Sequence, residues 1–367
     1  MHLDQACLKL YVAQGREVDS GSAGLLTQMS THTNVDPTSA PIRVAYAPFG
    51  DPTADVILRS VKSNVDFYVF KMFLSYASPF FKQMFTLPQE GVDQATKDGL
   101  PIIPVNEDEQ TLDLLLRCCY PRWHSQSEKK PDLESLILVL EASIKYEMEE
   151  VEKCIRTELV AARFLTEQPM RVYAIALRHR LVPEAKLAAR ETLRLPLLGR
   201  EYIDELEDIT AGALYRLQDY HVLCSDVAIQ VAKSLEWLTS DNFTWFECLE
   251  CRSQSHGSQT YVTISGHRRK WVMSKWWAEY MTQATTALGE RPSGASVMHV
   301  DLTDEALRKA NMCSGCRGRA FKEMRIFSEA FAAEVDRVTS DVSVLIDSGD
   351  NGAFNDHMEQ VNLEVKL

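Results

Sequence analysis

Residues 55–85 decide the fold of the first half of the chain and read DVILRS-VKSN-VDFYVFK-MFLSYASPFFKQMF. Successive side chains of a β-strand point to opposite faces, so Val56 and Leu58 share one face. This spacing predicts a half-buried strand that leads through a short turn into a second strand. The second strand presents one apolar face, formed by Val65, Phe67 and Val69.

The segment after this hairpin predicts a helical turn followed by a second helix. Ser78 precedes Pro79, and serine caps a helix well while proline is tolerated in its first turn. Bulky apolar side chains then recur at helical spacing. We expect the core to contain Val56, Leu58, Phe67, Leu74, Phe81, Met84 and Phe85.

These residues carry a resemblance to the BTB/POZ domain, an α/β (α+β) module of protein–protein association. The family's histidine before the lysine is replaced here by Phe70, so no role of an imidazole is carried over. The matching positions are Asp55-Val56, Phe67, Val69, Lys71, Leu74, Ser78, Phe81, Met84 and Phe85.

The resemblance extends downstream and gives a domain over residues 48–165. It predicts a third strand at 100–105 and helices at 111–120, 133–146 and 151–159. It also implies a homodimer, in which Asp55 and Lys71 place an acidic and a basic group in a pocket at the dimer interface. An ordinary strand-end aspartate and a solvated lysine are the alternative for this pair.

Composition limits the remaining classes of protein. The 367 residues are 45% hydrophobic, enough for two domains. No apolar run approaches the ~20 residues that cross a bilayer, and residues 1–46 show no secretory signal pattern. Nine cysteines in such a chain indicate a reducing compartment, so we expect an intracellular protein of the cytoplasm or nucleus. The net charge of −13 disfavours nucleic acid and anionic membranes.

The rest of the chain divides by composition and periodicity into segments around the BTB-like domain. A mostly α-helical region is expected after it, without a specific motif. The expected segments are a disordered stretch 1–47, a helical extension 166–240, a helical region 241–335 with paired cysteines, and an acidic flexible tail 336–367.

Two CxxC pairs form the second informative feature. Cys248 and Cys251 make one pair, and Cys313 and Cys316 make the other. Two such knuckles can supply four thiolates in a tetrahedron, which suits a structural Zn²⁺ and leaves no open position for catalysis. The sequence therefore predicts one structural zinc ion.

Other interpretations of these residues stay open. The cysteines could be free and buried, since a thiol packs as a small apolar group. A redox role is less supported, because neither pair follows a strand and opens a helix. His256, His267 or His299 could replace one sulfur, and His221 with Cys224 forms a weaker HxxC candidate on a helix.

One basic run could contact phosphates. His267-Arg268-Arg269-Lys270 precedes Trp271, and Arg317 and Arg319 lie beside the second knuckle. A run this short in an acidic chain is more often a solvated loop. Trp276 and Trp277 are expected in the core rather than in a ligand cage.

The sequence favours a non-enzymatic interaction protein. It contains none of the GxSxG, Walker, HExxH or dinucleotide-binding motifs. Three functions remain: an oligomerising scaffold, a substrate adaptor of a cullin-type ubiquitin ligase, and a transcription-related protein whose zinc region contacts nucleic acid. The first is preferred because the strongest motif is an association module.

Overall fold

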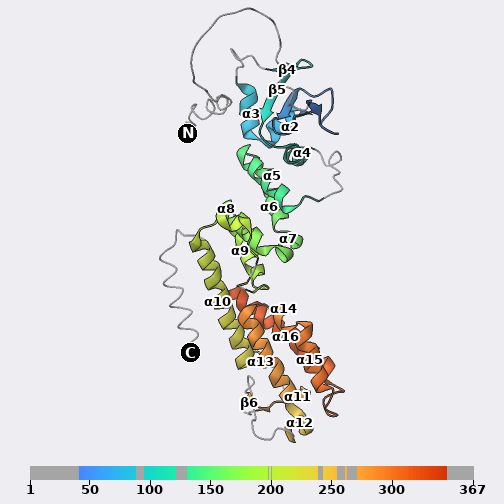
Figure 1. Cartoon of the computed structure of the whole chain (residues 1–367), viewed down its shortest axis with the longest axis vertical. Coiled ribbons are helices and arrows are strands. Elements are labelled where there is room, and N and C mark those ends of the chain that lie inside the picture. The colour runs from blue at the N-terminus through green and yellow to red at the C-terminus, as the bar shows by residue number, and fades with distance from the viewer. Residues whose placement is uncertain are drawn as a thin grey trace, which may run out of the picture. The chain divides into compact units, whose positions relative to one another are not determined.

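The structure is a computed structural model. It describes residues 41–87, 95–120, 130–196, 198–199, 201–238, 243–253, 261–262 and 271–344, with the backbone alone for 252–253, 261–262 and 271–272. Of the stretch 1–47 that is expected to be disordered, residues 1–40 therefore lie outside the described part of the chain. Figure 1 shows the helices and strands of the described residues.

A five-stranded sheet with the order β1-β3-β2-β5-β4 forms the N-terminal part. The hairpin expected from the sequence is the antiparallel pair β2–β3, in which Leu58 lies opposite Phe67. The later strand β5 runs parallel to β2 and makes β2 central. The strands are β1 (Arg43–Val44), β2 (Val56–Ser60), β3 (Val65–Val69), β4 (Thr96–Lys97) and β5 (Leu100–Val105).

The prediction of a half-buried first strand is wrong, because β2 is buried on both faces. Val56 and Leu58 belong to the main core, and Ile57 on the opposite face is also fully buried. On that opposite face Ile57 packs in a small second cluster with Ala54 and with its neighbours in the sheet, Tyr68 of β3 and Ile102 of β5.

Two short helices follow the hairpin, α2 (Lys71–Ala77) and α3 (Pro79–Thr86). Ser78 caps α3 as expected, since its hydroxyl accepts a hydrogen bond from the Phe81 N–H at 3.0 Å. The same hydroxyl donates to the Tyr146 carbonyl at 2.6 Å, which fixes α3 against the later helices. Of the predicted core residues, Met84 and Phe85 are only partly buried at its margin.

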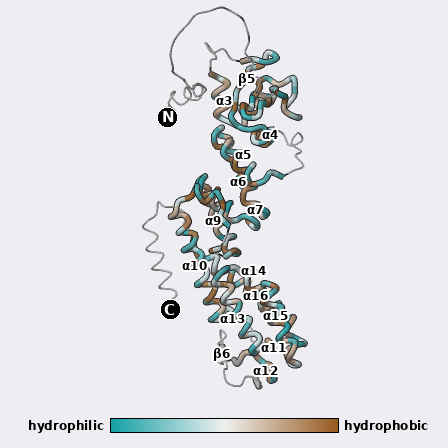
Figure 2. The backbone as a smooth tube through the Cα atoms, in the orientation of Figure 1, coloured by the Kyte–Doolittle hydropathy of each residue, from teal (hydrophilic) through white to brown (hydrophobic). Residues whose placement is uncertain are grey.

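Helices complete the first core, which extends beyond the expected boundary at residue 165. Phe164, Val172 and Ala185 share one hydrophobic cluster with the sheet. Polar and apolar residues alternate along α5 and α10 (Figure 2). The helices are α4 (Glu109–Cys119), α5 (Leu133–Lys145), α6 (Glu149–Leu159), α7 (Ala162–Glu167), α8 (Pro169–Arg178), α9 (Val182–Thr192), the 3₁₀ turn η2 (Asp204–Asp208) and α10 (Ala211–Ser234).

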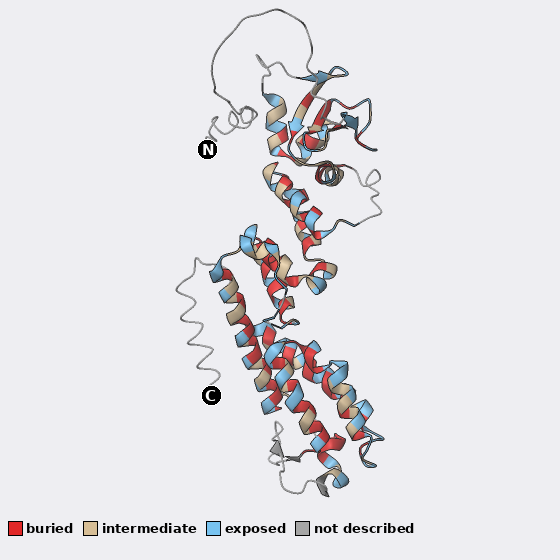
Figure 3. Ribbon diagram, in the orientation of Figure 1, coloured by how far each residue is buried: buried red, intermediate tan, exposed pale blue. Residues whose placement is uncertain are grey.

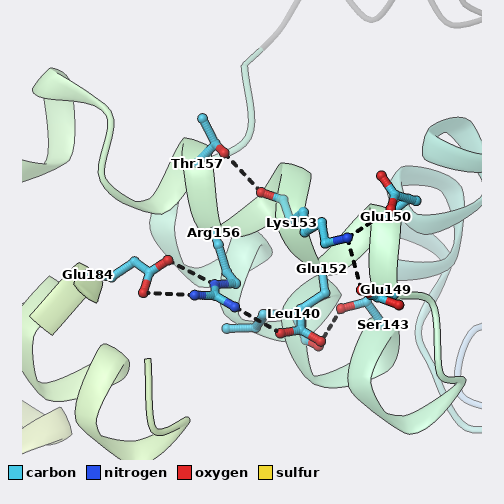
Figure 4. A network of polar contacts seen from close by, with 9 residues as sticks. All are labelled: Leu140, Ser143, Glu149, Glu150, Glu152, Lys153, Arg156, Thr157 and Glu184. Carbon is cyan, nitrogen blue, oxygen red and sulfur yellow. Dashed lines mark hydrogen bonds and ion pairs between the residues drawn. The ribbon is translucent and has the colours of Figure 1, made fainter. Parts of the chain in front are cut away.

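A partly buried, two-pronged ion pair links α6 to α9 (Figure 4). The Arg156 guanidinium donates to the two carboxylate oxygens of Glu184 at 2.8 and 3.2 Å. Glu152 lies 3.6 Å from the same guanidinium. This ion pair joins the last helix pair of the BTB-like domain to the helical extension.

The C-terminal part has a second core that begins on α10. Leu217 and Cys224 of α10 belong to the first core, whereas Ala228 and Val231 belong to the second. Buried residues run along α10 and along α13, which lies beside it (Figure 3). The remaining elements are α11 (Thr244–Glu247), α12 (Leu249–Ser253), β6 (Tyr261–Val262), β7 (Trp271–Val272), α13 (Lys275–Glu290), α14 (Gly294–Val297), α15 (Val300–Ala310) and α16 (Ala320–Asp341).

Two features of this part differ from the sequence-based segments. The region 241–335 contains one antiparallel strand pair, β6–β7, besides its helices. The boundary expected at 336 falls inside α16, where Thr339 is still buried; residues beyond 344 lie outside the described part of the chain. Each helix among the described residues is too short or too polar to cross a membrane.

Candidate metal centre and association face

The structure brings the two CxxC pairs together. The Sγ atoms of Cys248, Cys251, Cys313 and Cys316 all lie within 4.8 Å of one another. Cys248 lies 3.6 Å from Cys313, and Cys251 lies 3.5 Å from Cys316. A disulfide would require about 2.05 Å, whereas a tetrahedron with Zn–S bonds of about 2.3 Å separates its sulfurs by about 3.8 Å. The four thiols therefore have the spacing of a tetrahedral metal site.

Each knuckle sits where helices begin or end. Cys248 ends α11 and Cys251 lies in α12, while the second pair lies in the turns between α15 and α16. Glu323 of α16 holds the first knuckle, since its carboxylate accepts the Thr244 N–H at 2.6 Å. The first turn of α16 thus holds the start of α11, the helix that leads into the first knuckle.

Glu250 connects the knuckles directly. Its carboxylate accepts hydrogen bonds from the Ser314 hydroxyl, from the Gly315 N–H at 3.2 Å and from the Cys313 thiol at 3.2 Å. An Sγ, an Oγ and a backbone N–H of the second knuckle therefore converge on one side chain of the first. The Glu250 side chain therefore ties the two knuckles together.

Gly315 is required by space rather than by its backbone angle. A Cβ atom at this position would lie 2.9 Å from the Cys248 sulfur, closer than such atoms normally approach. At Gly318 a Cβ would meet nothing within 4 Å. Of the two glycines near the second knuckle, Gly315 leaves the room that the sulfur cluster occupies.

Burial and neighbouring groups shift the pKa values of the thiols in this cluster in different directions. Burial raises the pKa of Cys316, although the Trp276 indole N–H acts against this shift; that indole nitrogen has no nitrogen or oxygen partner among the described residues. Burial and the Glu250 carboxylate raise the pKa of Cys313 to about 11. Burial opposes ionisation of Cys248 too, but the Cys251 N–H and the neighbouring thiols lower its pKa. Four thiolates so close together require a positive ion at their centre.

The other ligands considered from the sequence lie elsewhere or outside the described residues. The His299 ring is near Asp301, its Nδ1 accepting the Asp301 N–H at 3.4 Å, and it does not join the cysteine cluster. His256 and His267 fall outside the described residues, as does the basic run up to Lys270.

The HxxC pair on α10 belongs to the interior. His221 is buried and its Nε2 lies 2.9 Å from the Thr192 hydroxyl. Cys224 is fully buried, and burial raises its thiol pKa to about 12. Trp276 and Trp277 are also buried, as the sequence indicated.

Asp55 and Lys71 are adjacent, but they meet through the backbone. The Asp55 carboxylate accepts the Lys71 N–H at 2.7 Å, which fixes the start of α2 against β2. The Lys71 ammonium lies 5.6 Å from the centre of the Phe85 ring. No side-chain ion pair joins Asp55 to Lys71 in the part of the chain that the structure describes. Their place at a dimer interface stays a prediction.

The solvent face of α2 carries large apolar side chains. Met72 is 68% exposed and Tyr76 is 94% exposed. They are four residues apart and so lie on one side of the helix. Phe73 and Leu74 point inward instead and pack with the first core.

Comparison with known proteins identifies the N-terminal part. Residues 50–162 match the family model of the BTB/POZ domain. No curated protein matches the chain. This sheet-and-helix unit is therefore a BTB/POZ domain, a module of protein–protein interaction, and the chain is a BTB domain-containing protein. The expected α/β domain followed by a mostly helical region is confirmed.

Several residues that build the metal centre were missed by sequence reasoning. Glu250 and Glu323 are acidic residues in an acidic chain and carry no distinctive pattern. The position of Glu250 inside a CxxC was the one available signal, since such a residue must lie beside the sulfurs. Contacts between residues over 60 positions apart cannot be read from local periodicity.

Proposed function

We propose that this protein is a non-enzymatic interaction protein that self-associates through its BTB/POZ domain. A structural Zn²⁺ held by the four cysteines stabilises the C-terminal part. Self-association is supported by the exposure of Met72 and Tyr76 on α2. The structural zinc is supported by the mutual proximity of the four cysteine sulfurs.

The face of α2 has the chemistry of an association site. Exposed large apolar side chains gain free energy when a partner removes them from water. Aromatic residues such as tyrosine supply much contact area with few rotatable bonds, and they are enriched among residues that dominate binding energy. Asp55 and Lys71 adjoin this face at the start of α2.

Light scattering after size-exclusion chromatography of the full chain tests self-association. We expect wild-type protein to be a dimer and Met72→Glu/Tyr76→Glu to associate at least about 30-fold more weakly, as for a hot-spot residue. Tyr215→Glu is the matched control, since Tyr215 is 60% exposed on α10. A wild-type chain that stays monomeric over the whole concentration range contradicts self-association.

Metal analysis of full-length protein purified without added zinc tests the second half. We expect one equivalent of zinc, and Cys251→Ser should lose it. Cys154→Ser is the control, because Cys154 is an exposed free cysteine outside the cluster. Less than half an equivalent in the wild type rejects the site.

A second candidate function is substrate adaptor of a cullin-type ubiquitin ligase. It is supported by the shared core and by the Arg156–Glu184 fork, which hold the helical extension on the BTB/POZ domain. A receptor region attached to such an extension would be presented rigidly. Calorimetric titration with a purified cullin N-terminal domain tests this function, and the absence of heat at micromolar concentrations excludes it.

The transcription-related alternative receives less support. Arg319 beside the second knuckle is paired with Glu247 and Glu323 at 3.1 and 2.6 Å. Its charge is therefore compensated within the chain. The overall charge of −13 also opposes binding of a long polyanion.

A further inference from the structure

The end of the C-terminal part that holds the cysteines exposes large apolar side chains. Met312 is 82% exposed, Leu249 is 74% exposed and Phe321 is 70% exposed. Leu249 and Met312 adjoin Cys248 and Cys313, whose sulfurs lie 3.6 Å apart. Phe321 follows Ala320, whose N–H donates to the Cys316 carbonyl at 2.9 Å. Each of the three therefore lies within a few residues of a cysteine of the cluster.

Two cations next to Phe321 have no carboxylate partner among the described residues. Arg317 and Lys322 are exposed and take part in none of the ion pairs there. They differ in this from their neighbours. In the described residues 300–341, the cations with a carboxylate within ion-pair distance are Arg308, Lys309, Arg319, Arg325 and Arg337.

We infer that Leu249, Met312, Arg317, Phe321 and Lys322 form a docking surface for an acidic peptide segment with a bulky apolar anchor. The uncompensated cations select negative charge by electrostatic complementarity. The exposed apolar side chains receive the anchor, whose burial supplies the larger share of the affinity. The surface extends the proposed function by giving the C-terminal part a partner class of its own.

The charges favour a short acidic segment over nucleic acid or an anionic membrane. A long polyanion would experience the repulsion of the whole chain, whose net charge is −13. A short peptide can place a few carboxylates on Arg317 and Lys322, while charges beyond about 8 Å are screened at physiological salt.

Fluorescence anisotropy with the full-length protein tests the surface. The probe is a labelled peptide in which Asp and Glu residues flank a Phe-Leu pair. Two comparison probes are the same peptide with Lys in place of Asp and Glu, and a single-stranded oligonucleotide. We expect the acidic peptide to bind most tightly and to lose affinity as salt is raised.

Variants assign the binding to these residues. Lys322→Glu should weaken binding of the acidic peptide at least about tenfold, and Phe321→Ser should weaken it about 30-fold. Lys233→Glu is the matched control, since Lys233 is an exposed cation on α10 without an ion pair among the described residues. Because Lys322 is exposed, its variant tests the surface even if Phe321→Ser fails to fold.

Zinc content and oligomeric state are measured on the same samples. A failure of the proposed function is therefore distinguished from a failure of peptide binding. Peptide binding that Lys322→Glu and Phe321→Ser leave unchanged overturns the inference. Equal affinity for the acidic and basic peptides overturns it too, as does a preference for the oligonucleotide.

Discussion

The two hydrophobic cores of this protein differ in their residue composition. The core of the BTB/POZ domain and its extension is largely aliphatic, with Leu116 and Val139 at its centre. The second core is smaller and has a larger share of aromatic rings: Trp245 stacks on Trp277 with centroids 5.7 Å apart, and Phe327 packs edge-on against both. The sulfur cluster adjoins this second core, to which the buried Cys316 belongs.

This difference follows from how each part is connected. In the first core, neighbouring helices such as α8 and α9 or α5 and α6 pack directly on one another, so local periodicity suffices. In the second, α11 must be held against α16 although more than 70 residues separate Thr244 from Glu323. The proposed zinc ion, bound to both knuckles, would offset the entropy of closing so long a loop.

The largest expected effect comes from removing the metal ligands. Cys316→Ser should destabilise the second core by at least about 5 kcal/mol, as for loss of a structural zinc, while the first core stays folded. Tryptophan fluorescence reports the second core, which contains Trp245, Trp276 and Trp277, and helical circular dichroism reports both. Loss of both signals in one transition would show that the cores depend on each other.

A smaller effect is expected where the BTB/POZ domain meets the extension. Arg156→Met leaves the buried Glu184 carboxylate without its partner and should cost about 1–3 kcal/mol in urea unfolding. Lys153→Met is the matched control on the same helix, because its pairs with Glu149 and Glu150 are exposed (Figure 4) and contribute little. Equal losses in the two variants would contradict a rigid link between α6 and α9.

The two glycines near the second knuckle, Gly315 and Gly318, test whether steric room beside the sulfurs is needed for zinc binding. Gly315→Ala places a methyl group against the Cys248 sulfur and should weaken zinc binding about tenfold, or about 1.4 kcal/mol. Gly318→Ala should leave it unchanged, since nothing lies within 4 Å of its added Cβ. Competition with a chromogenic chelator measures both affinities. Equal zinc affinity of the two variants would mean that the knuckles adjust freely.

The smallest effect concerns acid stability of the first part. Burial alone would raise the pKa of Asp66, but hydrogen bonds from Arg59 and Lys97, at 2.6 and 2.7 Å, lower it below the usual value. A lowered pKa in the folded state stabilises the protein above about pH 4, and this contribution disappears as pH falls through the folded-state value. The stability difference between wild type and Asp66→Asn should therefore shrink below about pH 4. Urea unfolding at several pH values measures it, and a constant difference would contradict the role of this triad.

Most of the fold could be predicted because its signals are local. The hairpin β2–β3 and the Ser78 cap follow from spacing and from a single capping residue, whereas the helix α4 is expected from the resemblance to the BTB/POZ domain. Burial of Ile57 on the second face of β2 could not be predicted, because it depends on β5 pairing with β2 from about 45 positions away.

The sequence by itself determined that two knuckles of cysteine exist and that an association domain precedes them. Only the tertiary structure decided that the four sulfurs converge and that Glu250 and Trp276 lie beside them. It also decided that the Asp55 carboxylate binds the backbone N–H of Lys71 and not its side chain. The physical reason is the distance along the chain over which each interaction acts. Strand alternation and helix capping act over a few residues, whereas ligand geometry and burial depend on which distant segments the hydrophobic cores bring together.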